Sequence, residues 1–197
     1  MIYAFLKNRP LSWSALSSFQ YSPEQWYSRY ILGEKQEDTP EMVFGKTVGE
    51  RLASDPAYLP QVPRLSVFEH PMRCKFGKIP LVGYADTYEP KSKLYEYKTG
   101  KKEWDQKRAD EHGQIDMYLL MHYLIEKVRP EDVEVKLMWL PTQQNGDFSI
   151  SFIDENDVKI FSTRRTLLQV LEFGQKISKT VKAMDEYIHT HPLALPS

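Results

Sequence analysis

The sequence predicts an α/β protein in which a mixed central β-sheet of about five strands is flanked by helices, in the order αβββαβ. Three observations lead to this prediction. Helical apolar spacing occurs near both ends of the chain and over 109–127, strand-like runs bounded by turn signals fill 65–98, and a continuous apolar run covers 133–140. At 197 residues, of which 41% are hydrophobic and 27% charged, the chain is expected to form one globular domain, 1–197.

An N-terminal helical segment is expected over about 11–53. Ser12 or Ser14 can cap a first helix, because a serine side chain accepts a hydrogen bond from a free N–H of the first turn. Pro23 marks the start of a second helix, since the first turn does not need the N–H that proline lacks. A third helix is expected over 40–53.

Three strands are expected next. Residues 65–76 alternate loosely between apolar and polar side chains, and Phe76-Gly77-Lys78 has the composition of a turn into a second strand over 79–88. A loop over 90–92 then leads to a third strand, 94–98. These strands form the βββ part of the predicted order.

The second and third strands carry charged side chains that strand geometry can place together. Because successive side chains point to opposite faces, Glu96 and Lys98 share one face, about 6.5 to 7 Å apart, and the tyrosines beside them take the other. Asp86 joins this face only if the connection between the strands holds an odd number of residues, most simply the three in 90–92. An even connection would place Asp86 opposite Tyr97.

The C-terminal half is expected to add a helix, a hairpin and a last helix. Residues 109–127 show helical apolar spacing, and 133–140 form a buried strand. Asn145-Gly146 is a strong hairpin signal that leads into a strand over 148–153. A long C-terminal helix with an apolar stripe is expected over about 155–189.

Two acids and an amine on adjoining strands suit metal-assisted attack on a phosphate. Hard oxygen ligands select Mg²⁺ or Mn²⁺, so Asp86 and Glu96 are candidate ligands, together with the backbone carbonyl of Tyr97. Lys98 would orient or deprotonate the attacking water and help to bear developing negative charge. The competing interpretation is an exposed strand face with an ion pair worth well under ~1 kcal/mol.

The order of the motifs extends this pattern. GYAD ends at Asp86, EYKTG begins at Glu96, and QIDMY supplies Gln114 and Tyr118. In this order the chain resembles the PD-(D/E)XK nuclease superfamily, and it is similar to the branch with RecB-type nuclease domains, Cas4-like proteins and phage exonucleases. The opening LSWSALSSFQYSPEQWYSRYILGE is similar to the N-terminal helical signature of that branch. The resemblance covers most of the chain and implies a restriction-endonuclease-like core.

The resemblance also implies roles for individual residues. Asp86 and Glu96 would hold the metal, and Lys98 would activate water. Gln114 and Tyr118 lie four residues apart on one helix face, where they would bind DNA near the catalytic strand or buttress that strand.

The chain departs from that branch at two places. In that branch, a histidine or glutamate near the metal often follows a helix glycine by four residues. In this chain the position four residues after Gly45 is Gly49, and Glu50 comes next. Glu50 is therefore either a further metal ligand from a shifted register or a plain surface glutamate. Cas4-like proteins typically hold an iron–sulfur cluster on four cysteines, whereas Cys74 is the single cysteine here and Ser22-Pro23 replaces their Cys-Pro. The sequence excludes such a cluster.

Basic side chains follow the catalytic strand, and a tryptophan among them could stack on a base. These residues are Lys101, Lys102, Trp104, Lys107 and Arg108. Because acids are interleaved with them, a solvated charged loop is the competing interpretation. Two further basic residues, Arg164 and Arg165, fall on the predicted last helix and are expected at the surface.

Bulk properties limit the partners and the location. The formal net charge is −1, so any attraction for DNA must come from a local patch. The opening MIYAFLKNRP has too short an apolar run for a signal peptide, and no stretch approaches the length of a membrane span. We expect a cytoplasmic protein, from a bacterium or a phage-infected cell, that binds single- or double-stranded DNA and could act with a recombination partner protein.

The hypothesis from sequence is a Mg²⁺- or Mn²⁺-dependent deoxyribonuclease, acting as an exonuclease in recombination, repair or phage DNA processing. Two alternatives stay open. A catalytically silent protein of the same fold would bind DNA or a protein partner, and a restriction-type endonuclease would also cut closed circular DNA.

Overall fold

A computed structural model describes residues 3–6 and 9–191 of the chain. Its centre is a six-stranded sheet of order β1-β2-β3-β4-β5, with β6 also paired to β4. The strands are β1 (Val67–Phe76), β2 (Ile79–Glu89), β3 (Lys93–Gly100), β4 (Glu134–Gln144), β5 (Ile150–Phe152) and β6 (Lys159–Thr163). β3 and β4 are parallel and the other pairs antiparallel. The predicted mixed α/β class is confirmed, with six strands rather than about five.

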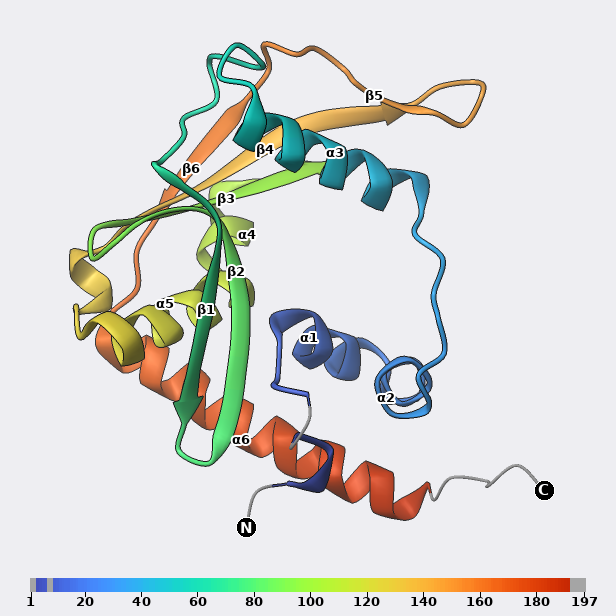
Figure 1. Ribbon diagram of the computed structural model, residues 1–197, viewed down its shortest axis with the longest axis vertical. Helices are drawn as coiled ribbons and strands as arrows, with labels where there is room; N and C mark the ends of the chain where they lie inside the picture. The colour runs from blue at the N-terminus through green and yellow to red at the C-terminus, as the bar shows by residue number, and fades with distance from the viewer. Residues whose placement is uncertain (1–2, 7–8, 192–197) are drawn as a thin grey trace.

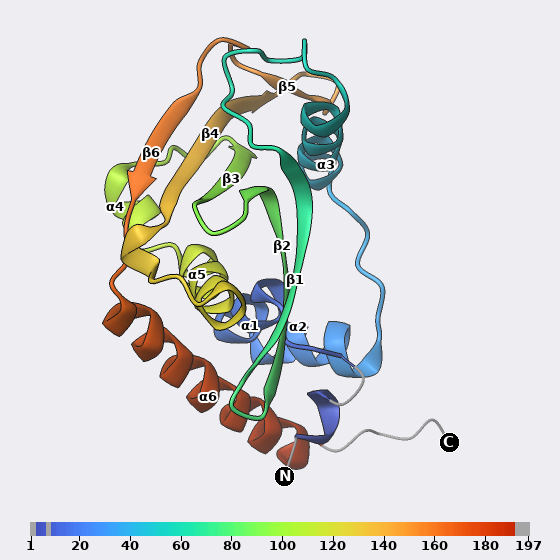
Figure 2. The same ribbon diagram turned by 60° about the vertical axis from the view of Figure 1, so that its left-hand side comes forward.

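The helices cover both faces of the sheet. They are η1 (Ala4–Leu6), α1 (Trp13–Tyr21), α2 (Pro23–Tyr27), η2 (Ser28–Leu32), α3 (Pro40–Ser54), α4 (Gln106–Asp110), α5 (Gly113–Glu126), η3 (Pro130–Asp132) and α6 (Leu167–Thr190). Figures 1 and 2 show α5 and α6 stacked on one face and α3 on the other. None of the helices in the described part of the chain has both the length and the apolar composition needed to cross a bilayer.

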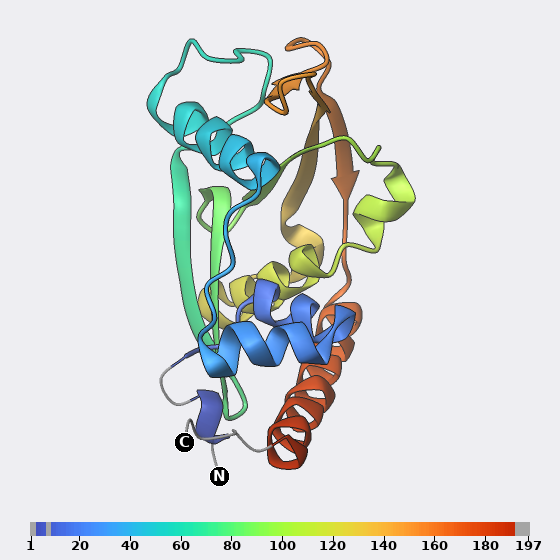
Figure 3. The ribbon, with the colours of Figure 1, turned by 90° about the vertical axis from the view of Figure 1, so that its right-hand side faces the viewer.

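Capping residues fix where the N-terminal helices begin. The hydroxyl of Ser12 accepts from Ala15 N and starts α1, so Ser12 rather than Ser14 is the cap. Ser22 caps α2 in the same way, and Pro23 occupies the first turn as expected. An extended segment, 33–39, then leads to α3 (Figure 3).

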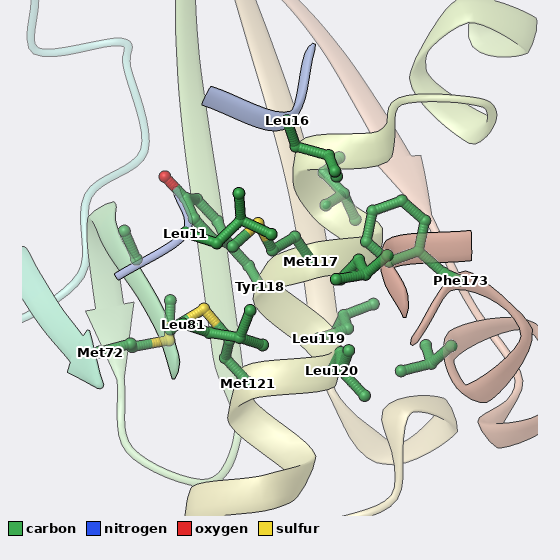
Figure 4. Close-up of a cluster of buried hydrophobic side chains, with 14 of the residues drawn as sticks. Leu11, Leu16, Met72, Leu81, Met117, Tyr118, Leu119, Leu120, Met121 and Phe173 are labelled. Carbon is green, nitrogen blue, oxygen red and sulfur yellow. The ribbon is translucent and has the colours of Figure 1, made fainter. Parts of the chain in front are cut away.

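Two apolar clusters lie on the two faces of the sheet. The larger one packs α5 between the sheet and α6, and Leu119 and Leu120 are 0% exposed because α5 is covered on both sides (Figure 4). The smaller one joins α3 to the other face of β3 and β4 and contains Val48, Tyr95 and Met138. The end of β3 is therefore held between α5 and α3.

The expected single C-terminal helix over 155–189 is wrong at its start. Residues 159–163 form β6, which pairs antiparallel with β4, and α6 begins only at Leu167. Thr166 caps α6 in a reciprocal capping box with Gln169. The β-branched and aromatic residues of β6 suit the edge of β4, and only the tertiary fold shows that this edge is available.

Arg165 is a second correction, because it is buried rather than at the surface. Its side chain is 4% exposed and donates hydrogen bonds to Asp116 and Thr163. These bonds tie α5 to the junction between β6 and α6. Arg164, the neighbouring arginine, is exposed as expected.

Other element bounds differ from the expectation. The helix expected over 109–127 is two helices, α4 and α5, with a break at 111–112. The strand expected over 133–140 runs on to Gln144, and the one expected over 148–153 covers only 150–152.

The β2–β3 hairpin sets the position of the site. The two strands pair over Thr87–Glu89 and Lys93–Tyr95, and a three-residue turn joins them, which confirms the predicted odd connection. Beyond these pairs β2 and β3 diverge, so that the hairpin opens into a V (Figure 1). α3 lies over one side of this V.

Candidate active site

Asp86 and Glu96 lie where β2 and β3 begin to separate. Thr87 is opposite Tyr95, so continuation of the register places Asp86 beside Glu96. Instead of a backbone pair, the Oδ2 atom of Asp86 accepts a hydrogen bond from Tyr97 N at 2.7 Å. The aspartate therefore fills the base of the V and links the two strands.

Lys98 completes the predicted trio from the same face of β3. Its Nζ atom donates to Glu96 Oε1 at 2.7 Å and to Gln114 Oε1 on α5 at 2.7 Å. The Glu96 side chain is only 2% exposed and that of Lys98 is 25% exposed. With Glu96 buried and Lys98 half-buried, the pair does not match the exposed strand face of the competing interpretation.

In the V, the carboxyl groups of Asp86 and Glu96 lie beside one ammonium, that of Lys98. Burial, followed by the charge of Glu96, raises the pKa of Asp86 to about 8, although Lys98 and the Tyr97 amide oppose the rise. Burial also raises the pKa of Glu96, with Lys98 opposing it. The second carboxylate oxygen of Glu96, Oε2, is buried and has no hydrogen-bond partner among the described residues.

The donor set fits a hard divalent cation. Among residues 3–6 and 9–191, no group of three or more His, Cys, Asp or Glu side chains is gathered so as to hold a metal ion as it stands. Asp86 and Glu96 nevertheless offer two carboxylates, and oxygen donors of this kind suit Mg²⁺ or Mn²⁺. The unpartnered Oε2 of Glu96 and the unbalanced charge are what a cation at this point would satisfy.

Gln114 and Tyr118 form a hydrogen-bonded chain behind Lys98. Gln114 Nε2 donates to the Tyr118 hydroxyl at 2.9 Å, and this hydroxyl donates to the backbone oxygen of Tyr84 on β2 at 2.7 Å. Tyr118 is 5% exposed, and a Cβ atom at Gly83 would lie 2.8 Å from its ring, so the glycine is what allows the ring to approach β2. Through this chain, α5 links Lys98 on β3 to the backbone of β2.

A cleft of about 800 Å³ opens above the V. Helix α3 lines one side of it, and Phe68, Glu69, Asp86 and 97–99 line the other. A Cβ atom at Gly45 would lie 2.9 Å from Thr99 Oγ1, so this glycine allows α3 to lie close to β3. The cleft gives solvent and ligands a route to Asp86 and Lys98.

Three glutamates, Glu41, Glu50 and Glu69, line the cleft. Glu50 on α3 is 66% exposed at its side chain, and its Oε1 atom lies 4.0 Å from Lys46 Nζ. Glu69 on β1 was not singled out from the sequence, yet the strand register places it opposite Asp86. Partial burial, followed by the charges of Asp86 and Glu50, raises the pKa of Glu69. The spacing of motifs gave no signal for Glu69, because it depends on the register of the β1–β2 hairpin.

In the basic segment after β3 the lysines are exposed, Arg108 is half-buried and the tryptophan is buried. Lys101, Lys102 and Lys107 are exposed, whereas Trp104 is 7% exposed. The guanidinium carbon of Arg108 lies 3.9 Å from the centroid of the Trp104 ring. The arginine therefore covers the ring that was considered as a stacking platform for a base.

Comparison with known proteins gives a likeness in fold. No family model and no curated protein matches the chain. A candidate exonuclease from Eubacterium rectale is similar with a TM-score of 0.59 and 11% identity over 99% of this chain and 92% of that one. A phage-related exonuclease from Haemophilus somnus gives 0.57 and 11% over 88% and 83%.

An alkaline exonuclease from Laribacter hongkongensis has a TM-score of 0.53 and 10% identity, over 94% of both chains. The similarity to these three structures covers between 88% and 99% of this chain. The fold of this protein is therefore shared with structures described as exonucleases.

Proposed function

We propose that the protein is a Mg²⁺- or Mn²⁺-dependent deoxyribonuclease that hydrolyses phosphodiester bonds, acting as an exonuclease in recombination, repair or phage DNA processing. The main support is the group at the base of the V, where Asp86 and a buried Glu96 with an unpartnered oxygen lie beside the Lys98 ammonium. The fold shared with three structures described as exonucleases is a second support.

Asp86 and Glu96 would hold the cation, with the backbone carbonyl of Tyr97. A strand residue directs its N–H and C=O toward the same edge. Since Tyr97 N bonds to Asp86, the Tyr97 carbonyl faces the same side. When bound, the cation supplies neutralisation of phosphate charge and activation of water.

Lys98 would act as a hydrogen-bond donor to the reacting groups. An ammonium has three N–H donors, and two of them are taken by Glu96 and Gln114 at 2.7 Å. The third is left for the attacking water or for a phosphate oxygen. Gln114 and Tyr118 would hold this ammonium in place, because the Tyr84 backbone fixes the far end of their chain.

The exposed lysines beyond β3 would contact the DNA backbone. Lys101, Lys102 and Lys107 offer exposed positive charge in the segment that follows the catalytic strand. Contacts of this kind add affinity without sequence preference and weaken as salt rises. Arg108 would act indirectly, by stacking on Trp104.

Digestion of end-labelled DNA with Mn²⁺ tests the proposal. The wild type should degrade linear DNA from its ends and leave covalently closed circles intact. Lys98→Ala should abolish this activity with the fold retained, and Lys182→Ala, which removes an exposed lysine of α6, should not. Equal activity in Lys98→Ala would refute the proposal, and cleavage of closed circles would favour an endonuclease.

A further inference from the structure

Glu69 occupies an irregular point of the β1–β2 hairpin, opposite Asp86. The strands pair at Phe68 with Thr87 and at His70 with Ala85, while the pair between these two, Glu69 with Asp86, is missing from the ladder. The φ angle of Glu69 is +47°, in the left-handed region that residues other than glycine seldom adopt. The backbone is therefore bent where Glu69 faces Asp86.

The bend changes which face of β1 each side chain takes. In a regular strand Phe68 and Met72 would share a face, because they are four residues apart. Here Phe68 packs in the cluster on the α3 side, and Met72 packs in the cluster on the α5 side. The change of face at Glu69 lets its side chain line the cleft together with Asp86.

Glu69 brings a third carboxylate to the group formed by Asp86, Glu96 and Lys98. The charge of Asp86 acts on Glu69, and the charge of Glu69 acts on Glu96, so the three lie within electrostatic reach of one another. The Lys98 ammonium bonds to Gln114 and to Oε1 of Glu96, and the buried Oε2 of Glu96 has no hydrogen-bond partner among the described residues. A divalent cation would supply both the missing charge and the missing partner.

Glu50 is the competing source of a third carboxylate. It projects from the exposed part of α3, and Lys46 lies near its carboxylate. Glu69 is also exposed, but it lies on the strand next to Asp86, at the interruption between the pairs Phe68–Thr87 and His70–Ala85.

We propose that Glu69 is the third carboxylate ligand of the divalent cation site. The inference rests on the proposed function for the existence of that cation, and it adds a ligand from β1 to those of β2 and β3. The cleft between α3 and the hairpin would then contain one Mg²⁺ or Mn²⁺ site built from three adjacent strands.

Calorimetric titration of the full chain with Mn²⁺ tests the assignment without reference to activity. Glu69→Gln should weaken Mn²⁺ binding by about tenfold or more. The matched control is Glu41→Gln, which removes a cleft glutamate at the start of α3 and should leave affinity within about twofold, since general charge effects at an exposed site are small. Glu50→Gln tests the rival ligand and should also have a small effect.

Glu69→Gly gives a second readout. It should raise the Tm in EDTA, because glycine adopts a positive φ freely and the substitution removes a charge beside Asp86. The same variant should lose most of the Tm rise that Mn²⁺ gives the wild type. A stabilised protein with an unchanged Mn²⁺ response would overturn the assignment.

The outcomes separate the two proposals. Equal Mn²⁺ affinity in wild type and Glu69→Gln, or a larger loss in Glu50→Gln, would overturn the role of Glu69 and leave the proposed nuclease standing. Absence of Mn²⁺ binding to the wild type would overturn both. Tenfold weaker binding in Glu69→Gln alone would support both.

Discussion

Asp86→Asn should stabilise the protein when no divalent cation is present. In the fold, burial next to Glu96 raises the Asp86 pKa from 3.8 to about 8. Between about pH 4 and pH 8 the unfolded chain therefore releases a proton that the folded chain keeps. Ionisation in this window favours the unfolded state, so the free energy of unfolding falls as pH rises through it. Asparagine removes this effect.

The magnitude follows from the pKa shift. Each pKa unit corresponds to about 1.4 kcal/mol, so a rise of about four units sets an upper bound of roughly 6 kcal/mol. Asp86 lines the cleft, and at such a site the effective dielectric constant is well above that of a dry interior. We therefore expect about 1 to 3 kcal/mol of added stability at pH 8, because the Asn oxygen can still accept the bond from Tyr97 N.

Urea unfolding in EDTA at pH 5, 7 and 9 measures the effect. Wild-type stability should fall across this series, and that of Asp86→Asn should fall less steeply, with Glu96 accounting for the remaining slope. Asp38→Asn, in the exposed segment before α3, controls for the loss of one negative charge. If Asp86→Asn is less stable than the wild type at pH 8, or if both variants change alike, the buried-charge reasoning is wrong.

Three other predictions concern the surroundings of the site. Tyr118→Phe removes the hydroxyl between Gln114 and β2 and should cost about 1 kcal/mol of stability. If the residue is a buttress, the variant should cleave DNA more slowly while its DNA affinity, measured by fluorescence anisotropy, stays unchanged. Arg165→Ala should lower the free energy of unfolding in urea by about 3 kcal/mol, because it leaves Asp116 without its buried partner. Arg164→Ala should have little effect, and similar losses in the two variants would contradict this account. Replacing the three exposed lysines that follow β3 by alanine should weaken DNA binding and flatten its salt dependence by about three in log–log slope; an unchanged slope would place the DNA elsewhere.

The convergence of Asp86, Glu96 and Lys98 could be predicted from the sequence because it depends on local geometry. Strand alternation puts Glu96 and Lys98 on one face, and the three-residue turn brings Asp86 alongside. Once the turn length is known, few strand registers are left that could place these side chains otherwise. The α/β class was predictable for a similar reason, since apolar spacing depends on neighbours along the chain.

Features that depend on distant contacts escaped prediction. Glu69 is seventeen residues before Asp86, and its place depends on a long hairpin and on a bend that no local signal marks. β6 was taken for helix because its partner edge on β4 is remote in sequence. Arg165 and Trp104 lie among charged residues in the sequence, which suggests exposed side chains. In the fold, Arg165 pairs with Asp116, and Arg108 covers the Trp104 ring.

The central claim is that Asp86 and Glu96 share one divalent cation beneath the Lys98 ammonium. The most direct measurement is an anomalous-difference map from crystals of the full chain soaked in Mn²⁺. We predict a peak about 2.0–2.6 Å from oxygens of Asp86, Glu96 and the Tyr97 carbonyl. The claim would be contradicted if the map showed no peak between β2 and β3, or if Mn²⁺ were bound only at acidic residues elsewhere on the surface.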